Sequence, residues 1–316
     1  MVSFVRAFVF SLLFAGLGLV PHVALAQSAE SGDEPTAPPD SMGWTYDATA
    51  RLNISQAAYK DWQEGGGVNT LAVTAATGGV AREKRGDWTQ THELRLALGI
   101  LDQEDQALRK AEDQIRYQSN VRYEGNGFFR IFNPTFAVQM RTQFASGFDY
   151  ENNPFEGEVD DPTDPRRDQE PPVETSSFFA PAFITESLGL TYEPVDQLTL
   201  RLGAASKQTV VVEENFRELY GVDPNSLARV EAGTEFAASL NTRLTENIRY
   251  RSDLNAFLAF NQLEEPPDVL WENTISLTVN NWLTTDLEFT ALYDETITDT
   301  IQLKETISVG LSFTLL

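Results

Sequence analysis

Side chains that commonly serve as catalytic bases, nucleophiles or soft metal ligands are scarce in this sequence. Its 316 residues include two histidines and no cysteine. His22 falls within an apolar N-terminal stretch, which leaves His92 for chemistry in the rest of the chain. Without cysteine there can be no disulfide and no thiolate metal site.

His92 is the residue to weigh for hydrolysis, because a nucleophilic serine needs a base beside it. Barrel phospholipases use an outward histidine and serine at a His-x-Ser spacing. His92 lies in Gln90-Thr-His-Glu-Leu94, which has no such serine, and it shares a face with Trp88 and Leu94. We interpret it as an interfacial histidine that points toward lipid, with a barrel hydrolase as the alternative. No histidine lies near the outer loops, where an acid-based barrel protease would need one. The sequence therefore predicts no enzyme, no catalytic residue and no cofactor.

Acidic residues dominate the charge, with 47 against 23 basic residues and a net charge of −24. They gather in 27–43 and in 146–177. Such a surface repels nucleic acid, so we expect no nucleic-acid partner. Residues 160–164 offer carboxylates to a hard cation, but two prolines and the lack of a turn glycine depart from a calcium loop. We predict no specific metal site, only loosely held divalent cations.

The N-terminus is typical of an exported protein. Residues 1–26 combine Arg6, an apolar run over 7–20 and Ala24-Leu25-Ala26, the pattern of a secretory signal peptide. The alternative, a membrane anchor, is disfavoured because the run is short for a span of ~20 residues. Residues 27–43 are acidic and rich in proline, which predicts a disordered leader.

From residue 44 onward, polar and apolar residues alternate, which indicates strands. We expect twelve: 44–56, 67–80, 88–100, 113–124, 128–145, 179–192, 197–211, 229–243, 248–261, 269–279, 283–293 and 301–316.

Short connections follow the even strands and long ones follow the odd strands. The short ones are 81–87, 125–127, 193–196, 245–247 and 280–281. This alternation and the even number of strands predict an all-β fold, a transmembrane antiparallel up-and-down β-barrel over 44–316. The long loops then share one rim, which we assign to the outside.

The polar strand faces carry large charged groups. A soluble barrel would turn such faces outward, whereas a membrane barrel turns them into a wet lumen and shows lipid its apolar faces. The predicted lumen-lining residues are Arg116, Arg122, Arg141, Gln143, Glu231, Glu235, Arg249, Arg251 and Asp253. Aromatic residues near strand ends suit the membrane interfaces, among them Trp44, Trp88, Tyr192, Trp271, Trp282 and Tyr293.

The acidic loop 146–177 is rich in proline, and we expect it to be too polar to build a core. Asp149 and Tyr150 lie where the fifth strand enters this loop, and Trp62 lies in the first outer hairpin. We interpret these three as loop-anchoring residues, with ligand binding as the alternative.

Several blocks are similar to a known family. They are Leu52-Asn-Ile-Ser-Gln-Ala-Ala-Tyr-Lys-Asp-Trp62 with Gly65-Gly66-Gly67 and Asn69, Arg141-Thr-Gln-Phe-Ala-Ser-Gly-Phe-Asp-Tyr150, Phe179-Ala-Pro-Ala-Phe183 and Leu188-Gly-Leu-Thr-Tyr-Glu-Pro194. Together they resemble a domain-of-unknown-function family of Bacteroidota-type outer-membrane β-barrel proteins. The resemblance covers nearly all of 44–316. It implies an outer-membrane barrel, and it transfers no activity and no catalytic residues.

The last ten residues, 307–316, resemble the C-terminal assembly signal of outer-membrane barrels, although Leu316 stands where a phenylalanine is usual. The resemblance implies the barrel-assembly machinery and outer-membrane lipid as partners.

Two functions remain open from the sequence. The first is a passive channel for small neutral or cationic solutes, since a twelve-strand lumen lies between filled eight-strand and open sixteen-strand barrels. The second is a closed structural or surface-interaction barrel that acts through its outer loops. The position of loop 146–177, inside the lumen or outside it, separates the two.

Overall fold

The computed structural model describes residues 43–57, 69–104, 106–159, 161–261, 263–264, 266–295 and 298–315. The predicted signal peptide, the leader up to residue 42 and Trp62 lie outside these residues. None of the helices in the described ranges is long and apolar enough to cross a membrane.

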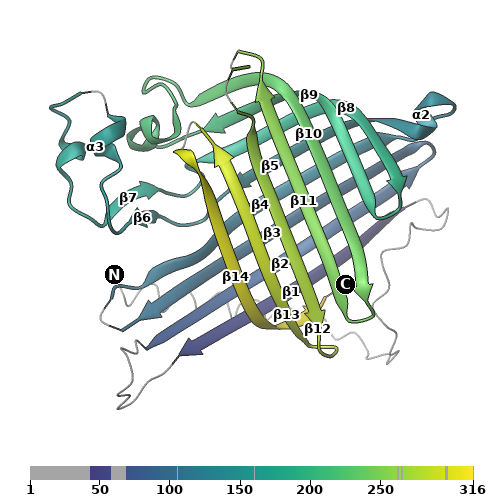
Figure 1. Cartoon of the computed structure of the whole chain (residues 1–316), viewed down its shortest axis with the longest axis horizontal. Coiled ribbons are helices and arrows are strands. Elements are labelled where there is room, and N and C mark those ends of the chain that lie inside the picture. Colours follow the sequence, from purple (N-terminus) through teal and green to yellow (C-terminus); the bar gives the residue numbers. More distant parts are fainter. Residues whose placement is uncertain are drawn as a thin grey trace. The chain divides into compact units, whose positions relative to one another are not determined.

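Twelve antiparallel strands close into a single barrel (Figure 1). The strands are β1 (Trp44–Ala57), β2 (Thr70–Arg85), β3 (Trp88–Gln103), β4 (Arg109–Tyr123), β5 (Phe132–Thr142), β8 (Ala182–Val195), β9 (Leu198–Val210), β10 (Ala228–Thr245), β11 (Ile248–Ala259), β12 (Asp268–Thr278), β13 (Leu283–Asp294) and β14 (Thr298–Thr314). Each strand pairs with the next one of the wall along the chain. β1 closes the ring against β14, with Leu52 opposite Leu311. The predicted all-β up-and-down barrel of twelve strands is confirmed.

The two faces of the wall differ in polarity, as the period of two requires. Outward positions expose large apolar side chains, with Leu188 66%, Leu202 58% and Ile307 73% exposed. Inward positions carry polar and charged groups that are buried, including Lys207 and Glu235. This outer surface is far more apolar than a soluble monomer commonly shows.

Two turns differ from their predicted form. The connection predicted over 81–87 is a tight turn at Gly86 and Asp87, because β2 continues to Arg85 and Gly86 adopts a φ of +61°. The fifth strand was predicted from residue 128, but a short helix, α2 (Phe128–Ile131), follows Gly127 and β5 begins at Phe132. A stack of aromatic rings favours this helix, since Phe128 lies 5.1 Å from Phe132, measured between ring centroids.

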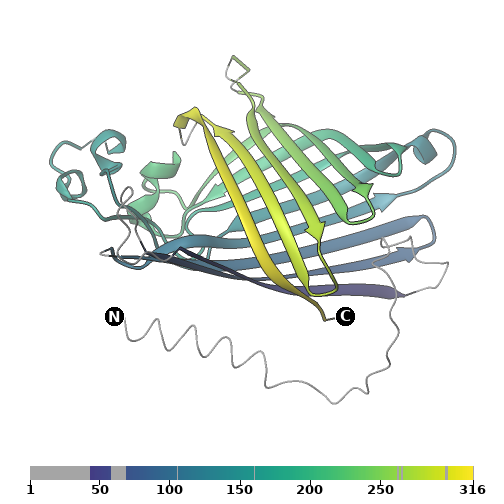
Figure 2. The same cartoon turned by 60° about the horizontal axis from the view of Figure 1, so that its bottom comes forward.

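The division into a short-turn rim and a long-loop rim holds with exceptions. α2 and the long loops lie at opposite ends of the barrel (Figures 1 and 2). The connection at α2 spans 124–131, which is longer than predicted. The connection from β13 to β14, predicted to be long, spans only 295–297.

The long loop 143–181 is folded, which corrects the expectation that it is too polar to build a core. It contains β6 (Gly147–Asp149), β7 (Val173–Ser176), α3 (Phe155–Glu158) and the 3₁₀ turn η1 (Pro165–Asp168). Its apolar residues pack against loop 211–227, which contains η2 (Glu214–Phe216) and η3 (Glu218–Tyr220). The shared core consists of Phe155, Val159, Val173, Ala180, Val211, Phe216 and Val222. We call these two loops together the loop cap.

Candidate functional site in the barrel lumen

A row of arginines crosses one wall of the lumen. Arg95 on β3, Arg116 on β4 and Arg141 on β5 are direct cross-strand partners, Arg95 with Arg116 and Arg116 with Arg141. Like charges placed directly opposite in a sheet destabilise it. This row therefore needs compensation from elsewhere in the lumen.

The first compensation comes from the opposite wall. β12 stands halfway round the ring of twelve strands from β4. Glu272 of β12 receives two hydrogen bonds from the Arg116 guanidinium, one of them 2.6 Å from Nη2 to Oε1. Arg116 is 9% exposed, so a bidentate ion pair spans the full width of a largely desolvated lumen.

A second ion pair crosses between β3 and β11, which also stand halfway round the ring from each other. Nη1 of Arg251 lies 3.7 Å from Oε1 of Glu93. Nε of Arg251 donates a hydrogen bond to Asp253 at 2.6 Å. Glu93 also pairs with Arg95 of the arginine row. Arg95 and Arg251 therefore share the Glu93 carboxylate, and Arg251 has Asp253 as a second partner.

A third crossing joins β9 to β12 and β13. Nζ of Lys207 donates to Asp268 and to Asp294, each at 2.7 Å. Nearby, Gln139 of β5 donates to Glu235 of β10 at 3.0 Å, and Glu235 also pairs with Arg201 at 3.1 Å. The lumen is therefore bridged at several points and is not an open tube along its whole length.

Opposite charges predominate on two facing walls of the lumen, although β3 also carries Glu93 and β11 also carries Arg251. The basic wall is β3 to β5, with the arginine row. The acidic wall is β11 to β13, directly across the ring, with Asp253, Asp268, Glu272, Asp286 and Asp294. An electric field transverse to the barrel axis follows from this arrangement, and low-dielectric walls strengthen such a field.

Between these crossings lies a cavity of about 110 Å³. Charged groups line it, including Arg116, Arg141 and Glu235, together with apolar groups such as Phe183 and Phe257. Every lining residue comes from a barrel strand, and none comes from 146–177. In the described part of the chain, the loop cap does not contribute to this cavity.

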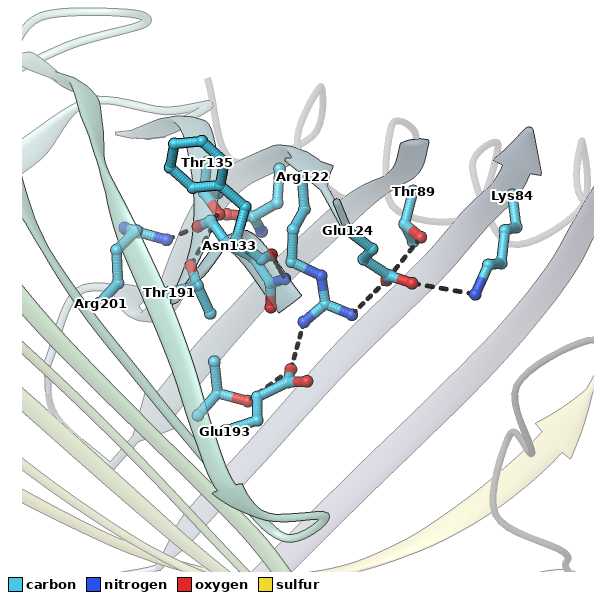
Figure 3. Close-up of polar contacts among 12 residues, drawn as sticks. Lys84, Thr89, Arg122, Glu124, Asn133, Thr135, Thr191, Glu193 and Arg201 are labelled. Atoms are coloured by element: carbon cyan, nitrogen blue, oxygen red, sulfur yellow. Dashed lines mark hydrogen bonds and ion pairs between the residues drawn. The ribbon is translucent and has the colours of Figure 1, made fainter. Parts of the chain in front are cut away.

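A separate polar network lies near the short-turn rim (Figure 3). Glu124 accepts hydrogen bonds from Lys84 at 2.9 Å, Thr89 at 2.8 Å and Arg122 at 2.8 Å, and Arg122 also pairs with Glu193. Burial alone would raise the pKa of Glu124, but these donors together lower it to about 2. The carboxylate is therefore ionised at neutral pH.

The structure distributes the predicted lumen residues over several regions. Arg116, Arg141 and Glu235 line the cavity, and Arg122 belongs to the network at the short-turn rim. Arg251 and Asp253 form the second crossing. Arg249 shares their strand face by alternation. Glu231 is buried and pairs with Arg229 at 3.1 Å.

Gln143 lies at the long-loop rim. Its side-chain amide donates to the carbonyls of Ser177 at 3.1 Å and Ala180 at 2.9 Å. These bonds hold a turn in which Phe179 has a φ of +57°, a conformation that costs energy for a bulky residue. Gln143 therefore positions the loop cap at its junction with β8.

Two of the three predicted loop-anchoring residues are described. Asp149 accepts backbone hydrogen bonds from Glu151 at 2.9 Å and Asn152 at 2.8 Å, which form a local turn. The ring of Tyr150 lies under the Arg109 guanidinium, with Cζ 4.3 Å from the ring centroid. Tyr150 thus contacts the barrel wall directly, and Trp62 lies outside the described residues.

Sequence reasoning missed Glu93, Arg95, Lys207, Asp268 and Glu272. Each of them follows the alternation of its strand, so the sequence alone could have predicted that its side chain points inward. The ion pairs that these residues form could not be predicted, because they join strands that are far apart in the sequence and face each other only after the ring closes.

His92 lies on the outward face, with Nδ1 3.1 Å from the Tyr117 hydroxyl and its ring 5.6 Å from that of Trp44. The register places Ser119 directly opposite His92, a neighbour that a His-x-Ser search cannot find. No hydrogen bond joins these two described residues. The histidine is oriented by aromatic neighbours.

Residues 54–148 match the model of a family described as proteins of unknown function, DUF3078. The match runs from the end of β1 into β6 and agrees with the resemblance to a domain-of-unknown-function family. The finer Bacteroidota-type assignment stays a prediction. Among curated proteins, none matches the sequence at a significant level.

Several solved structures have a similar architecture. The translocator domain of the autotransporter NalP from Neisseria meningitidis is 9% identical, with a TM-score of 0.38 over 87% of this chain and 89% of that one. An outer membrane channel from Pseudomonas putida F1 is 8% identical, with a TM-score of 0.38 over 91% and 99%. The Pseudomonas putida toluene transporter TodX is 10% identical, with a TM-score of 0.29 over 88% and 90%. At these identities the likeness says nothing about a solute.

Proposed function

We propose that this chain is a bacterial outer-membrane β-barrel that serves as a passive channel for small neutral or cationic solutes. The observation that carries the proposal is the lumen itself, where a row of arginines faces an acidic wall across the ring. A barrel that only needed to be filled could use apolar side chains at lower desolvation cost.

The polarity of the wall supports a membrane location. Exposed leucines, isoleucines and aromatic residues point outward, and ionised residues point inward, which is the arrangement of transmembrane barrels. Lipid would contact the outer face, and barrel-assembly machinery is the partner we expect for insertion.

The bridged lumen supports a limit on solute size. The Arg116–Glu272 and Lys207–Asp268 pairs span the path, and the cavity between the crossings measures about 110 Å³. Charges of both signs on opposite walls suit polar solutes with a dipole. The acidic loop 146–177 on the long-loop side disfavours anions at that mouth.

Liposome swelling tests this solute preference. Vesicles that contain the refolded barrel should swell in small neutral sugars and small organic cations, and more slowly in organic anions of equal size. The matched variants are E272Q, which removes a crossing carboxylate, and E246Q in the β10–β11 turn. E272Q should reduce the cation preference and E246Q should not. Equal swelling in all solutes, or none in any, would sink the proposal.

The loop cap favours a second candidate function. A pair of surface loops with its own hydrophobic core is more ordered than a passive connection requires. The alternative is a closed barrel that presents this cap to an extracellular partner. It predicts no conductance, and loss of partner binding on deletion of 146–177 while the barrel stays folded.

We further propose that the chain is not an enzyme and that His92 is an interfacial residue. Its contacts are aromatic, and it makes no hydrogen bond to Ser119 among the described residues. Refolded protein should release no fatty acid from phospholipid vesicles. Release that disappears in both H92A and S119A would overturn this.

A further inference from the structure

The crossing formed by Lys207 lies nearer the long-loop rim than the Arg116–Glu272 pair. Asp268 begins β12 and Asp294 ends β13, so both carboxylates lie at the long-loop ends of their strands, and Glu272 lies further along β12. Nζ of Lys207 donates to each of the two aspartates at 2.7 Å. A solute that comes from the long-loop side therefore meets the Lys207 crossing first.

This crossing uses a lysine, whereas the other two use arginines. The Arg116 guanidinium holds Glu272 through two hydrogen bonds from a rigid planar fork. The ammonium group of a lysine is a compact point charge on a flexible four-carbon stem, and its donors rotate. It can leave its carboxylates without any movement of the backbone. The Lys207 crossing is therefore the one most readily released.

A carboxylate is available to Lys207 on its own side of the lumen. Glu231 of β10 is the direct cross-strand partner of Lys207, and the Cβ atoms of such partners lie about 4.5–5.5 Å apart. Glu231 is buried and bound to Arg229. A Lys207 side chain that turned toward Glu231 would keep a carboxylate beside it. Its release from β12 and β13 therefore avoids the cost of an uncompensated buried charge.

The cavity sets the size of a group that could replace the Lys207 ammonium. Lys207, Asp268 and Asp294 all line it, and its volume is about 110 Å³. A cavity of about 150 Å³ holds benzene, so this one admits an ion of the size of methylammonium, which is much smaller. Exchange of one ammonium group for another also leaves the charge beside the two aspartates unchanged.

We propose that Asp268 and Asp294 form the outer binding site of the channel for small organic ammonium ions, and that Lys207 closes this site as a tethered ammonium. A solute's ammonium group takes the position of Nζ, and Lys207 turns toward Glu231. The inference rests on the proposed channel. It narrows the cationic solutes to primary ammonium ions, whose N–H groups replace those of Lys207.

Rescue of stability by a ligand tests this site without any transport step. K207A removes the tethered ammonium, and the denaturant midpoint of the refolded K207A barrel should rise with added methylammonium. Tetramethylammonium at equal ionic strength is the control, because it has the same charge and no N–H donor. Methylammonium should bind K207A about tenfold to a hundredfold more tightly than wild type, the range given by competition with one charged hydrogen-bonded contact.

K207A/D268N should lose most of this rescue, because one of the two carboxylates no longer carries a charge. Equal effects of methylammonium and tetramethylammonium on K207A would overturn the proposal. Equal binding of methylammonium to K207A and to wild type would do the same.

Methylammonium conductance in planar bilayers tests the tether. K207R keeps the charge but holds the carboxylates through a planar fork, so its steps should be smaller than those of wild type, and those of K207Q should be larger. K110Q is the matched control and should equal wild type, because Lys110 pairs with Asp113 at 2.9 Å and does not line the cavity. Equal steps in K207R and K207Q would overturn the tether.

The two experiments separate this inference from the proposed channel. Conductance without methylammonium rescue of K207A would reject the inference and leave the channel standing. Rescue without conductance in any variant would reject the channel, and with it the role of this site in transport. The K207R comparison conserves the charge, so it decides even if K207A fails to fold.

Discussion

At the scale of residues, the lumen contains charged side chains whose counter-ions lie on other strands. Arg116 has an arginine on each side in register, and Glu272, its one carboxylate partner among the described residues, reaches it from across the ring. E272Q leaves this guanidinium buried without a counter-ion, and removing one partner of a buried pair costs roughly 3–5 kcal/mol. Because water in the lumen partly solvates the guanidinium, the loss of stability should lie near the lower end of this range. Denaturant unfolding of the refolded barrel measures it.

The double variant R116Q/E272Q removes both charges and should recover much of that stability. A double variant as unstable as the sum of the two single variants would mean that the two residues are not coupled.

Glu124 should confer a pH dependence at the short-turn rim. Because donors hold its folded-state pKa at about 2, below the ordinary value near 4.5, its stabilisation is complete above about pH 4.5. It should be lost as the pH falls from there toward 2. Unfolding midpoints of wild type and E124Q should therefore differ at pH 7 and converge near pH 2. A constant difference would contradict the ion network of Figure 3.

At the scale of elements, the loop cap depends on packing between two loops that are distant in the sequence. Phe155 is 2% exposed in the shared core, and Arg166 pairs with Glu218 of the other loop at 2.6 Å. F155A should open the cap while the barrel stays intact, since a buried Phe→Ala change costs roughly 3–5 kcal/mol. Limited proteolysis should therefore cleave F155A within 146–177 faster than it cleaves the wild type.

F148A is the matched control, because Phe148 belongs to the same loop and is 44% exposed. Equal cutting rates for F155A and F148A would show that the core does not hold the cap closed.

The strands could be predicted from the sequence, whereas the contacts between distant elements could not. Alternation located all twelve wall strands, but the tight hairpin predicted at 125–127 is a longer connection that contains α2. The loop core could not be foreseen within 146–177 alone, because Phe155 and Val173 find their partners on residues such as Phe216. Likewise, alternation turned Arg116 inward but could not identify Glu272 as its partner, since only ring closure brings β4 and β12 face to face.

At the scale of the whole molecule, the closed ring converts strand patterns into a lumen with opposed charges. β3 to β5 and β11 to β13 stand on opposite sides of that ring. No described residue of the loop cap lines the cavity between them. Deleting 146–177 should therefore leave the size of any conductance step unchanged, and a larger step would mean that this loop obstructs the path.

Single-channel recording in planar bilayers tests the central claim, that the charged lumen is the path for solutes. Wild-type protein should give small, discrete conductance steps. R116Q/E272Q, which removes the ion pair across the lumen, should give larger steps from the same number of insertions, and E246Q should match wild type. Correctly folded protein that gives no steps, in wild type and in R116Q/E272Q alike, would contradict the channel.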